Sequence, residues 1–293
     1  MTKYSIDQFS QITGITKFVL RTWENRYGFL KAERTDTKIR YYTDDLLVRA
    51  LNCNYLLENG LKISVVSKLS DDEIRQKVDS IKNSSDNKSK EAYYISKLIE
   101  SALEFDSKLF HLTYDSGVRE LGIIEFYKSV LLIAFNKVGI FWLTNRIAPS
   151  QEHFLSELVK QKVSAAADSA SLNINSKESW LLFLPENEFH DIGLMFAKFL
   201  LVKHGYEVIY LGNNIPYGSL QQLAEKRRVD NVLFFSISNT SKSNLDFTTD
   251  YINKTFPSAK HYLVANGLDI NFLTQEKSLI VMENLDEFID IIN

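Results

Sequence analysis

A histidine between two carboxylates follows an apolar run at positions 180–184, in a pattern that can bind a metal. The polar segment reads Pro185-Glu186-Asn187-Glu188-Phe189-His190-Asp191-Ile192-Gly193. If the run is a strand of an open α/β sheet, His190 lies at its carboxyl end, where such sheets bind ligands. Its imidazole can then reach a metal, while Glu188 or Asp191 fixes the tautomer through the other ring nitrogen. His190 is therefore a candidate metal ligand, and an ordinary surface histidine is the alternative.

A second group of residues with clear chemistry is a cluster of cations near the N-terminus. The whole chain has a net charge of −3, but positions 15–42 hold seven basic and three acidic residues, which gives that segment a charge of +4. The basic residues are Lys17, Arg21, Arg26, Lys31, Arg34, Lys38 and Arg40. Clustered cations neutralise phosphates whatever the overall charge. The segment is a candidate nucleic-acid interface, and an ordinary solvated surface is the alternative.

Two short helices and a hairpin are the elements that must position these cations. Ser5 can cap a helix over residues 6–12, Gly14 supplies a tight turn, and Thr16 can cap a second helix. The residues of the second helix expected to face inward are Val19, Leu20 and Trp23. The following segment, 31–42, has the length of a small β-hairpin or wing. Cations on the second helix and on the wing can then bind phosphates on either side of a DNA groove.

This N-terminal segment resembles the DNA-binding domain of MerR-type transcriptional regulators over about residues 3–75. The shared motifs are Tyr4-Ser5-Ile6, Gly14-Ile15, Leu20-Arg21-x-Trp23-Glu24-x-Arg26-Tyr27-Gly28 and Arg40-Tyr41-Tyr42-x-x-Asp45-Leu46. In that family the second helix enters the major groove and the wing contacts the DNA backbone. The resemblance implies that Trp23 and Tyr27 lie mainly in the core. It implies DNA contacts from Lys17, Arg21, Arg26, Arg34, Lys38, Arg40 and Tyr41.

Two further regions follow the polar segment at 83–90, whose composition predicts a linker. From 91 to about 172, apolar residues recur every three or four positions, interrupted at Gly117, Gly122 and Pro149, and predict about four helices. After 173, short apolar runs alternate with helix-length segments and predict a parallel sheet. The predicted strands are Trp180–Leu184, Val208–Leu211, Val232–Phe235 and His261–Ala265.

The predicted fold is multidomain, with α regions followed by an α/β region. A winged helix-turn-helix is expected over residues 1–80 and a four-helix bundle cap over 91–174. A Rossmann-like (flavodoxin-like) parallel-sheet domain is expected over 175–293.

The sequence Glu188-x-His190-x-x-Gly193 resembles the Asp/Glu-x-His-x-x-Gly signature of cobalamin-binding domains. Ser236-Ile237-Ser238 begins after a further 42 residues, where the family has Ser-x-Leu, and Asn266-Gly267 follows 27 residues later, where it has Gly-Gly. The intervening Leu211-Gly212-x-x-Ile215-Pro216 also fits the pattern. The resemblance implies that His190 is the lower cobalt ligand and displaces the cofactor's own benzimidazole base. The glycines would leave a path for the nucleotide tail between sheet and helices.

The helical region supplies a third match. Trp142, nine residues and then Glu152-His153 resembles the Trp-x9-Glu-His signature of the helical cap in light-sensing cobalamin regulators. A planar ring can pack against an adenosyl group, and Glu152 with His153 can form hydrogen bonds to its ribose and base. The alternative is a core tryptophan and a helix cap. The residues that the resemblance implies in cofactor binding are Trp142, Glu152, His153, Glu188, His190, Asp191, Gly193, Ser236, Ser238, Asn266 and Gly267.

The order of the three regions is that of the adenosylcobalamin-dependent photoreceptor repressors, and the resemblance covers nearly the whole chain. It implies a tetramer that holds adenosylcobalamin in the dark, binds operator DNA and blocks transcription. Light breaks the Co–C bond in that family, and the tetramer releases DNA as it comes apart. Joined DNA modules gain effective concentration, so disassembly abolishes tight binding without altering any DNA contact. The cofactor then acts as ligand and chromophore, and no enzyme is predicted.

Three residues depart from that family and leave alternatives open. Leu143 follows Trp142 where relatives with a stable light-state adduct have a histidine, and an aliphatic side chain cannot ligate cobalt. The photoproduct is then water-ligated, or uses His153, or light sensing has been lost. Asn266 and Ser238 favour a second hypothesis, a cobalamin-independent regulator whose C-terminal domain binds a protein partner. A cobalamin-dependent methyltransferase or mutase would need a substrate barrel, for which the sequence offers no segment.

Composition limits the remaining possibilities. The chain has 293 residues, of which 45% are hydrophobic and 12% aromatic, enough for two or three folded domains and against wholesale disorder. The longest apolar stretch, 129–143, is interrupted by Asn136 and Lys137 and is shorter than the roughly 20 residues of a membrane helix. The N-terminal residues lack the pattern of a secretory signal, so a cytoplasmic protein is expected. The single cysteine, Cys53, lies in an apolar helical pattern and is expected to be buried.

Overall fold

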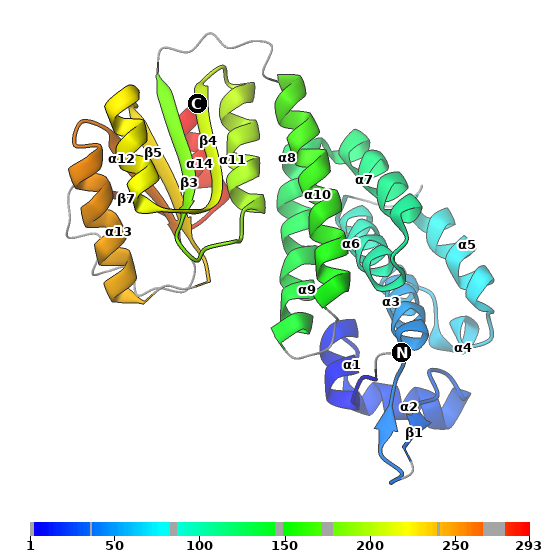
Figure 1. The fold of residues 1–293 in the computed structure, drawn as a ribbon. Coiled ribbons are helices and arrows are strands. Elements are labelled where there is room, and N and C mark those ends of the chain that lie inside the picture. Colours follow the sequence, from blue (N-terminus) through cyan, green and yellow to red (C-terminus); the bar gives the residue numbers. More distant parts are fainter. Residues whose placement is uncertain are drawn as a thin grey trace. The chain divides into compact units, whose positions relative to one another are not determined.

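The computed structural model describes residues 3–35, 37–82, 87–143, 149–170, 178–238, 241–265 and 279–293 (Figure 1). The chain forms two compact units, Met1–Leu158 and Val159–Asn293. Helix α10 (Pro149–Ala170) carries the chain from the first unit into the second. Within the described ranges, no helix is both long and apolar enough to cross a membrane.

The first unit begins with the predicted helix-turn-helix. Helix α1 (Ile6–Thr13) starts at Ser5, whose hydroxyl accepts a hydrogen bond from a backbone N–H of the first turn. Gly14 ends the helix with a φ of 74°, a left-handed conformation that glycine adopts at little cost. Helix α2 (Lys17–Tyr27) starts at Thr16, whose hydroxyl caps it in the same way. Both helices and the turn between them are confirmed.

A two-stranded wing follows, also as predicted. Strand β1 (Glu33–Arg34) pairs antiparallel with β2 (Arg40–Tyr41). Tyr42, directly after β2, is fully buried and stacks on the ring of Phe9 in α1, with ring centroids 4.1 Å apart. Leu20 and Trp23 of α2 are buried in the same domain. The wing is therefore anchored to the helical core.

The remaining helices of the first unit follow the wing in the chain (Figure 1). They are α3 (Asp44–Glu58), α4 (Ile63–Val66), α5 (Asp71–Lys82), α6 (Asn87–Glu104), α7 (Ser107–Leu121), α8 (Ile123–Phe126) and α9 (Leu132–Leu143). A π-helical segment, η1 (Tyr127–Leu131), joins α8 to α9 without a break. Cys53 in α3 is buried, as expected, and burial raises the pKa of its thiol to about 12.

Two boundaries in this unit differ from the prediction. Helix α6 begins at Asn87, so residues 87–90 of the predicted linker are helical, and Lys90 lies 3.6 Å from a carboxylate oxygen of Glu120 in α7. Gly117 lies inside α7 and does not interrupt it. A Cβ at Gly117 would lie 2.1 Å from the ring of Phe126, so this glycine allows close helix packing.

The second unit is the predicted parallel α/β domain, with one strand more than expected. Its five strands lie in the order β4-β3-β5-β6-β7, all parallel. They are β3 (Ser179–Pro185), β4 (Glu207–Ile215), β5 (Asn231–Ser236), β6 (Lys260–Ala265) and β7 (Leu279–Met282). This order is that of flavodoxin-like sheets, in which ligands bind where neighbouring strands send the chain in opposite directions. Here that point lies between β3 and β5.

Four helices cover the two faces of this sheet (Figure 1). They are α11 (Ile192–Lys203), α12 (Tyr217–Lys226), α13 (Lys242–Thr255) and α14 (Leu285–Ile292). Phe183 and Phe234 pack with buried residues of α12 and α13 on one face. Trp180, which points to the opposite face, packs against Phe288 of α14. Phe235 on that same face meets α11 at Gly193.

Candidate functional site

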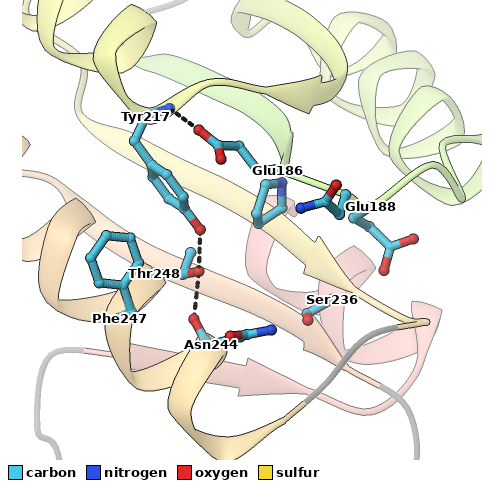
Figure 2. Close-up of a pocket in the computed structure, with 9 residues that line it drawn as sticks. Glu186, Glu188, Tyr217, Ser236, Asn244, Phe247 and Thr248 are labelled. Atoms are coloured by element: carbon cyan, nitrogen blue, oxygen red, sulfur yellow. Dashed lines mark hydrogen bonds between the residues drawn. The ribbon is translucent and has the colours of Figure 1, made fainter.

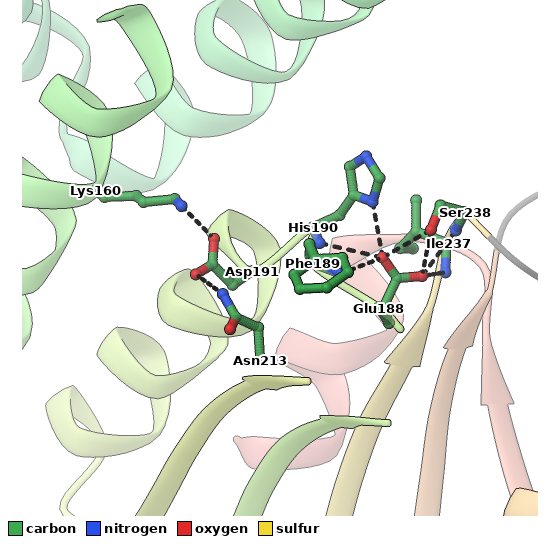
Figure 3. A network of polar contacts seen from close by, with 8 residues as sticks. All are labelled: Lys160, Glu188, Phe189, His190, Asp191, Asn213, Ile237 and Ser238. Atoms are coloured by element: carbon green, nitrogen blue, oxygen red, sulfur yellow. Dashed lines mark hydrogen bonds and ion pairs between the residues drawn. The ribbon is translucent and has the colours of Figure 1, made fainter. Parts of the chain in front are cut away.

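The loop between β3 and α11 holds Glu188 and His190 in direct contact (Figure 3). Oε1 of Glu188 lies 2.7 Å from Nδ1 of His190. The Glu188 side chain is 5% exposed, whereas the His190 side chain is 60% exposed. The imidazole therefore stands at the surface of the carboxyl edge of the sheet on a buried carboxylate, with its ring directed away from the strands.

The same carboxylate binds the loop that follows β5. Oε2 of Glu188 accepts hydrogen bonds from the backbone N–H groups of Ile237 and Ser238, at 2.7 and 2.8 Å. The Ser238 hydroxyl also donates to Oε1, at 3.0 Å. Ser238 replaces the leucine of the expected signature, and its hydroxyl has a defined structural role here. Glu188 thus joins the loop after β3 to the loop after β5.

These contacts determine the charge of Glu188 and the tautomer of His190. Burial raises the pKa of Glu188, but hydrogen bonds from the His190 ring and from the backbone of Ser238, His190 and Ile237 outweigh burial and hold the pKa well below its ordinary value. The carboxylate is therefore ionised, and Nδ1 of a neutral His190 carries the proton that Glu188 accepts. The lone pair then lies on Nε2, the nitrogen that can bind a metal.

Asp191 has different partners, although the sequence left it open as the partner of His190. Its Oδ1 lies 2.9 Å from Nζ of Lys160, in the part of α10 that belongs to the second unit. Its Oδ2 accepts a hydrogen bond from the Asn213 side chain at 2.9 Å (Figure 3). Asp191 therefore connects α10, the start of α11 and the end of β4.

Gly193, the last residue of the signature, lies against an aromatic ring. A Cβ at this position would approach Cε2 of Phe235 to 2.8 Å, closer than real Cβ contacts. Phe235 is 8% exposed, on the face of the sheet that α11 covers. The space beside this glycine, which the sequence assigned to a nucleotide tail, is filled by that ring in this structure.

A cavity of about 170 Å³ opens next to Glu188, where β3 and β5 end (Figure 2). Ser236 lines it from the end of β5, and Tyr217 and Phe247 line it from α12 and α13. The Tyr217 hydroxyl lies 2.7 Å from the Thr248 hydroxyl, and the Tyr217 backbone N–H donates to Glu186 at 3.1 Å. Ser236 is thus at a cavity on the α12 and α13 face, whereas Gly193 packs on the opposite face.

The cations predicted to contact DNA divide into two groups. Lys17, Arg21 and Arg26 are exposed on α2, and Arg34 and Lys38 are exposed on the wing. Lys17 forms an ion pair with Asp7 of α1, and the Arg26 guanidinium lies 5.4 Å from the centre of its neighbour's ring, Tyr27. All five nevertheless keep their charged ends at the surface of the helix-turn-helix and wing.

Arg40 and Tyr41 form contacts within the domain. Nε of Arg40 lies 3.1 Å from Oε2 of Glu24 in α2. The Tyr41 hydroxyl donates to Glu33 across the wing, and Nζ of Lys3 lies 4.4 Å from the centre of the Tyr41 ring. Both side chains therefore have a structural role in addition to any contact with DNA.

Comparison with known proteins places these elements in context. Residues 4–73 match the MerR HTH family regulatory protein. The chain is 24% identical to the HTH-type transcriptional repressor CarH of Myxococcus xanthus over 257 residues, which are 87% of this chain and 85% of CarH. Residues 4–73 thus form a MerR-type helix-turn-helix domain.

Two further matches extend the comparison. It is 25% identical to the HTH-type transcriptional repressor CarA of Myxococcus xanthus over 228 residues, which are 77% of this chain and 73% of CarA. The structure of the Methanosarcina barkeri monomethylamine corrinoid protein matches it with a TM-score of 0.53 and 17% identity, and covers 68% of this chain and 94% of that one. At such low identity the structural match establishes a shared fold alone.

The remaining residues predicted to bind the cofactor lie on α9 and α10 or outside the described residues. Glu152 and His153 lie on α10 in the first unit, where Oε2 of Glu152 is 3.3 Å from Nδ1 of His153. Trp142 is helical, at the end of α9, and its side chain lies outside the described part of the structure. Asn266 and Gly267 lie outside the described residues altogether.

Two exposed, uncharged residues of α2 also lie on the candidate DNA-binding surface, and the charge pattern of the sequence did not indicate them. Phe18 is 79% exposed, and Asn25 is exposed on the same helix. A signal was present, since an apolar residue at position 18 falls on the outward side of an amphipathic helix whose inward residues are Leu20 and Trp23.

Proposed function

We propose that this MerR-type regulator is a repressor whose oligomeric state and DNA binding are controlled by adenosylcobalamin, held through His190, and by light. The observation that carries the proposal is the exposed imidazole of His190 on the buried, ionised carboxylate of Glu188. CarH and CarA are repressors with which this chain aligns along most of its length, which supports repression.

The residues around His190 fit a metal that brings most of its own ligands. Imidazole nitrogen is a suitable ligand for late transition metals, and a carboxylate behind it is the usual outer partner. In the described ranges, no group of three His, Cys, Asp or Glu side chains could hold a metal ion by itself. Phe189, next to His190, is 57% exposed and offers an apolar surface to a large planar ring. His190 would supply one ligand to a metal whose macrocycle supplies most of the others.

Each protein group has a definite task in this proposal. Glu188 holds the proton on Nδ1 of His190, which leaves the lone pair on Nε2, and Nε2 would be the atom that binds the cobalt. Ile237 and Ser238 hold Glu188 in place through three hydrogen bonds. When bound, adenosylcobalamin would supply a visible chromophore and a light-sensitive Co–C bond. Trp142, Glu152 and His153 are proposed to contribute to adenosylcobalamin binding.

The DNA-binding surface is proposed to consist of α2 and the wing. Lys17, Arg21 and Arg26 would bind phosphates beside the major groove, and Arg34 and Lys38 would bind the backbone next to it. A tetramer would hold several such domains together, so each contact gains effective concentration. Loss of the tetramer would release DNA although every one of these side chains remains in place.

Size-exclusion chromatography with absorbance detection tests this function. The full chain is incubated with adenosylcobalamin and run once in the dark and once after green light, and each fraction is assayed for binding to DNA from its own promoter. The proposal predicts a coloured dark tetramer that binds DNA and a smaller species after illumination that does not. His190→Ala is expected to elute without colour, whereas the control His204→Ala should behave as the wild type.

The filled space beside Gly193 favours a second candidate, a cobalamin-independent regulator whose C-terminal domain binds a protein partner. The ring of Phe235 lies directly against Gly193, the glycine that the sequence pattern associates with the path of the nucleotide tail. In this case the chain would remain colourless in the same experiment. Neither its elution volume nor its DNA binding would change with the cofactor or with light.

A further inference from the structure

Phe18 places an exposed phenyl ring on the first turn of α2. It is 79% exposed, the highest value among the large hydrophobic residues that the structure describes. The helix around it is well fixed, because Thr16 caps it and Lys17 forms an ion pair with α1. An ordered helix therefore presents an apolar group to solvent at its N-terminal end.

The ring belongs to a distinct face of the helix. Phe18, Arg21 and Asn25 follow a spacing of three and four residues, which places them in one row, and all three are exposed. Thr22 does not compete for this surface, because its hydroxyl donates back to the Phe18 carbonyl oxygen at 2.8 Å. The row thus combines an apolar ring, a guanidinium and an amide.

The phenyl ring matches one of the kinds of contact that read base edges. In helix-turn-helix proteins, the N-terminal residues of the second helix contact bases in the major groove. Thymine is distinguished there by its 5-methyl group, which apolar side chains including phenylalanine contact. A phosphate-binding role does not suit Phe18, because a phenyl ring cannot neutralise charge, whereas cations flank it at Lys17 and Arg21.

We infer that Phe18 contacts the 5-methyl group of a thymine in the operator and makes the chain specific for thymine at that position. The inference rests on the DNA-binding function proposed above. It differs from the contacts expected of the cations, which fix affinity without reading sequence directly.

The experiment begins with selection from a pool of random duplex DNA. Full-length wild type and Phe18→Ala are each used to enrich sequences, in the dark with adenosylcobalamin and in parallel without it. Phe18 is exposed, so its truncation should leave the fold intact, which circular dichroism checks. Leu112→Ala is the matched control, since Leu112 is an exposed apolar residue on α7, at 62%.

Thymine-to-deoxyuridine replacement then tests the methyl contact one position at a time. This change removes the methyl group and keeps the hydrogen-bonding pattern. For the wild type, we expect one position per half-site at which replacement weakens binding about fourfold, the value of one buried methyl-sized group. Phe18→Ala should bind thymine DNA more weakly, show no further loss at that position, and no longer enrich thymine there.

The salt dependence separates base reading from phosphate binding. Phe18→Ala should leave the slope of log Kd against log salt concentration unchanged, whereas Arg21→Ala should reduce it by about one. The inference is overturned if Phe18→Ala enriches the same thymine, or loses as much affinity as the wild type on each replacement. A wild-type chain that enriches no sequence in either condition would instead contradict the DNA-binding function, and the inference with it.

Discussion

Oε1 of Glu188 lies 2.7 Å from Nδ1 of His190, and the same carboxylate accepts two backbone N–H groups from the loop after β5. One buried side chain therefore orients the candidate metal ligand and joins the loops that follow β3 and β5. Any change at position 188 should alter the chemistry of His190 and the stability of the second unit together.

Replacing Glu188 by glutamine tests its effect on His190. Glutamine keeps the size of the side chain but is neutral, and it can turn an NH₂ group towards Nδ1. We expect the affinity for adenosylcobalamin to fall about 10- to 100-fold, as for other outer partners of metal-bound histidines. Absorbance titration measures the affinity, and Glu186→Gln in the same loop is the control. Equal affinities for the wild type and Glu188→Gln would contradict the orienting role.

The low pKa of Glu188 predicts a dependence of stability on pH. Burial opposes ionisation, but hydrogen bonds from His190, Ser238 and Ile237 hold the folded-state pKa below that of the unfolded chain. The contribution of Glu188 is therefore complete above its unfolded-state pKa, near 4.3, and is lost as the pH falls through the acid range. Urea unfolding of the wild type and Glu188→Gln between pH 7 and pH 3 should show the two free energies converging at low pH. A constant difference over this range would contradict the assignment.

Gly193→Ala should be destabilising because its new methyl group would meet the ring of Phe235. Overpacking of this kind costs about 1–3 kcal/mol. Gly218→Ala in α12 is the matched control, since a Cβ at that position contacts nothing within 4 Å. Adding Phe235→Leu should restore most of the lost stability. Thermal unfolding of the wild type, Gly193→Ala, Phe235→Leu and the double variant gives the coupling energy between the two positions. Additive effects would mean that the two residues do not interact.

Arg40 and Arg34 should separate structural from DNA-binding cations of the wing. Arg40→Ala removes a charged hydrogen bond to Glu24, and we expect a loss of about 1–2 kcal/mol in the free energy of unfolding. Arg34→Ala should leave stability unchanged and lower the salt slope of DNA binding by about one. Both quantities are measured on the full chain. An Arg34 variant with wild-type salt dependence would remove this residue from the interface.

Local signals account for the parts of the fold that the sequence predicted well. Ser5 and Thr16 act as caps through bonds to their own helices, and Gly14 supplies a left-handed turn, so each depends on neighbours a few residues away. The four predicted strands were recognised as runs of apolar residues for the same reason. Strand β7 (Leu279–Met282) was not predicted, although its apolar run is as long as two of the runs that were recognised as strands.

Contacts between distant positions account for what the sequence could not show. The choice of Glu188 over Asp191 as the partner of His190 depends on Lys160 and Asn213, which occupy Asp191 from other elements. The ring of Phe235 against Gly193 joins residues 42 positions apart, and periodicity gives no information on such pairs. The sequence pattern places the apolar Phe18 on the outward side of α2. The structure then shows that its ring is exposed in one row with Arg21 and Asn25.

The visible absorption spectrum of the full chain with adenosylcobalamin, taken in the dark, tests whether His190 binds the cofactor. We expect the wild type to retain the cofactor through gel filtration with its benzimidazole base displaced, and His190→Ala not to retain it. Retention of the cofactor by His190→Ala with the wild-type spectrum would contradict ligation by His190. A wild-type chain that emerges colourless would contradict cobalamin control itself.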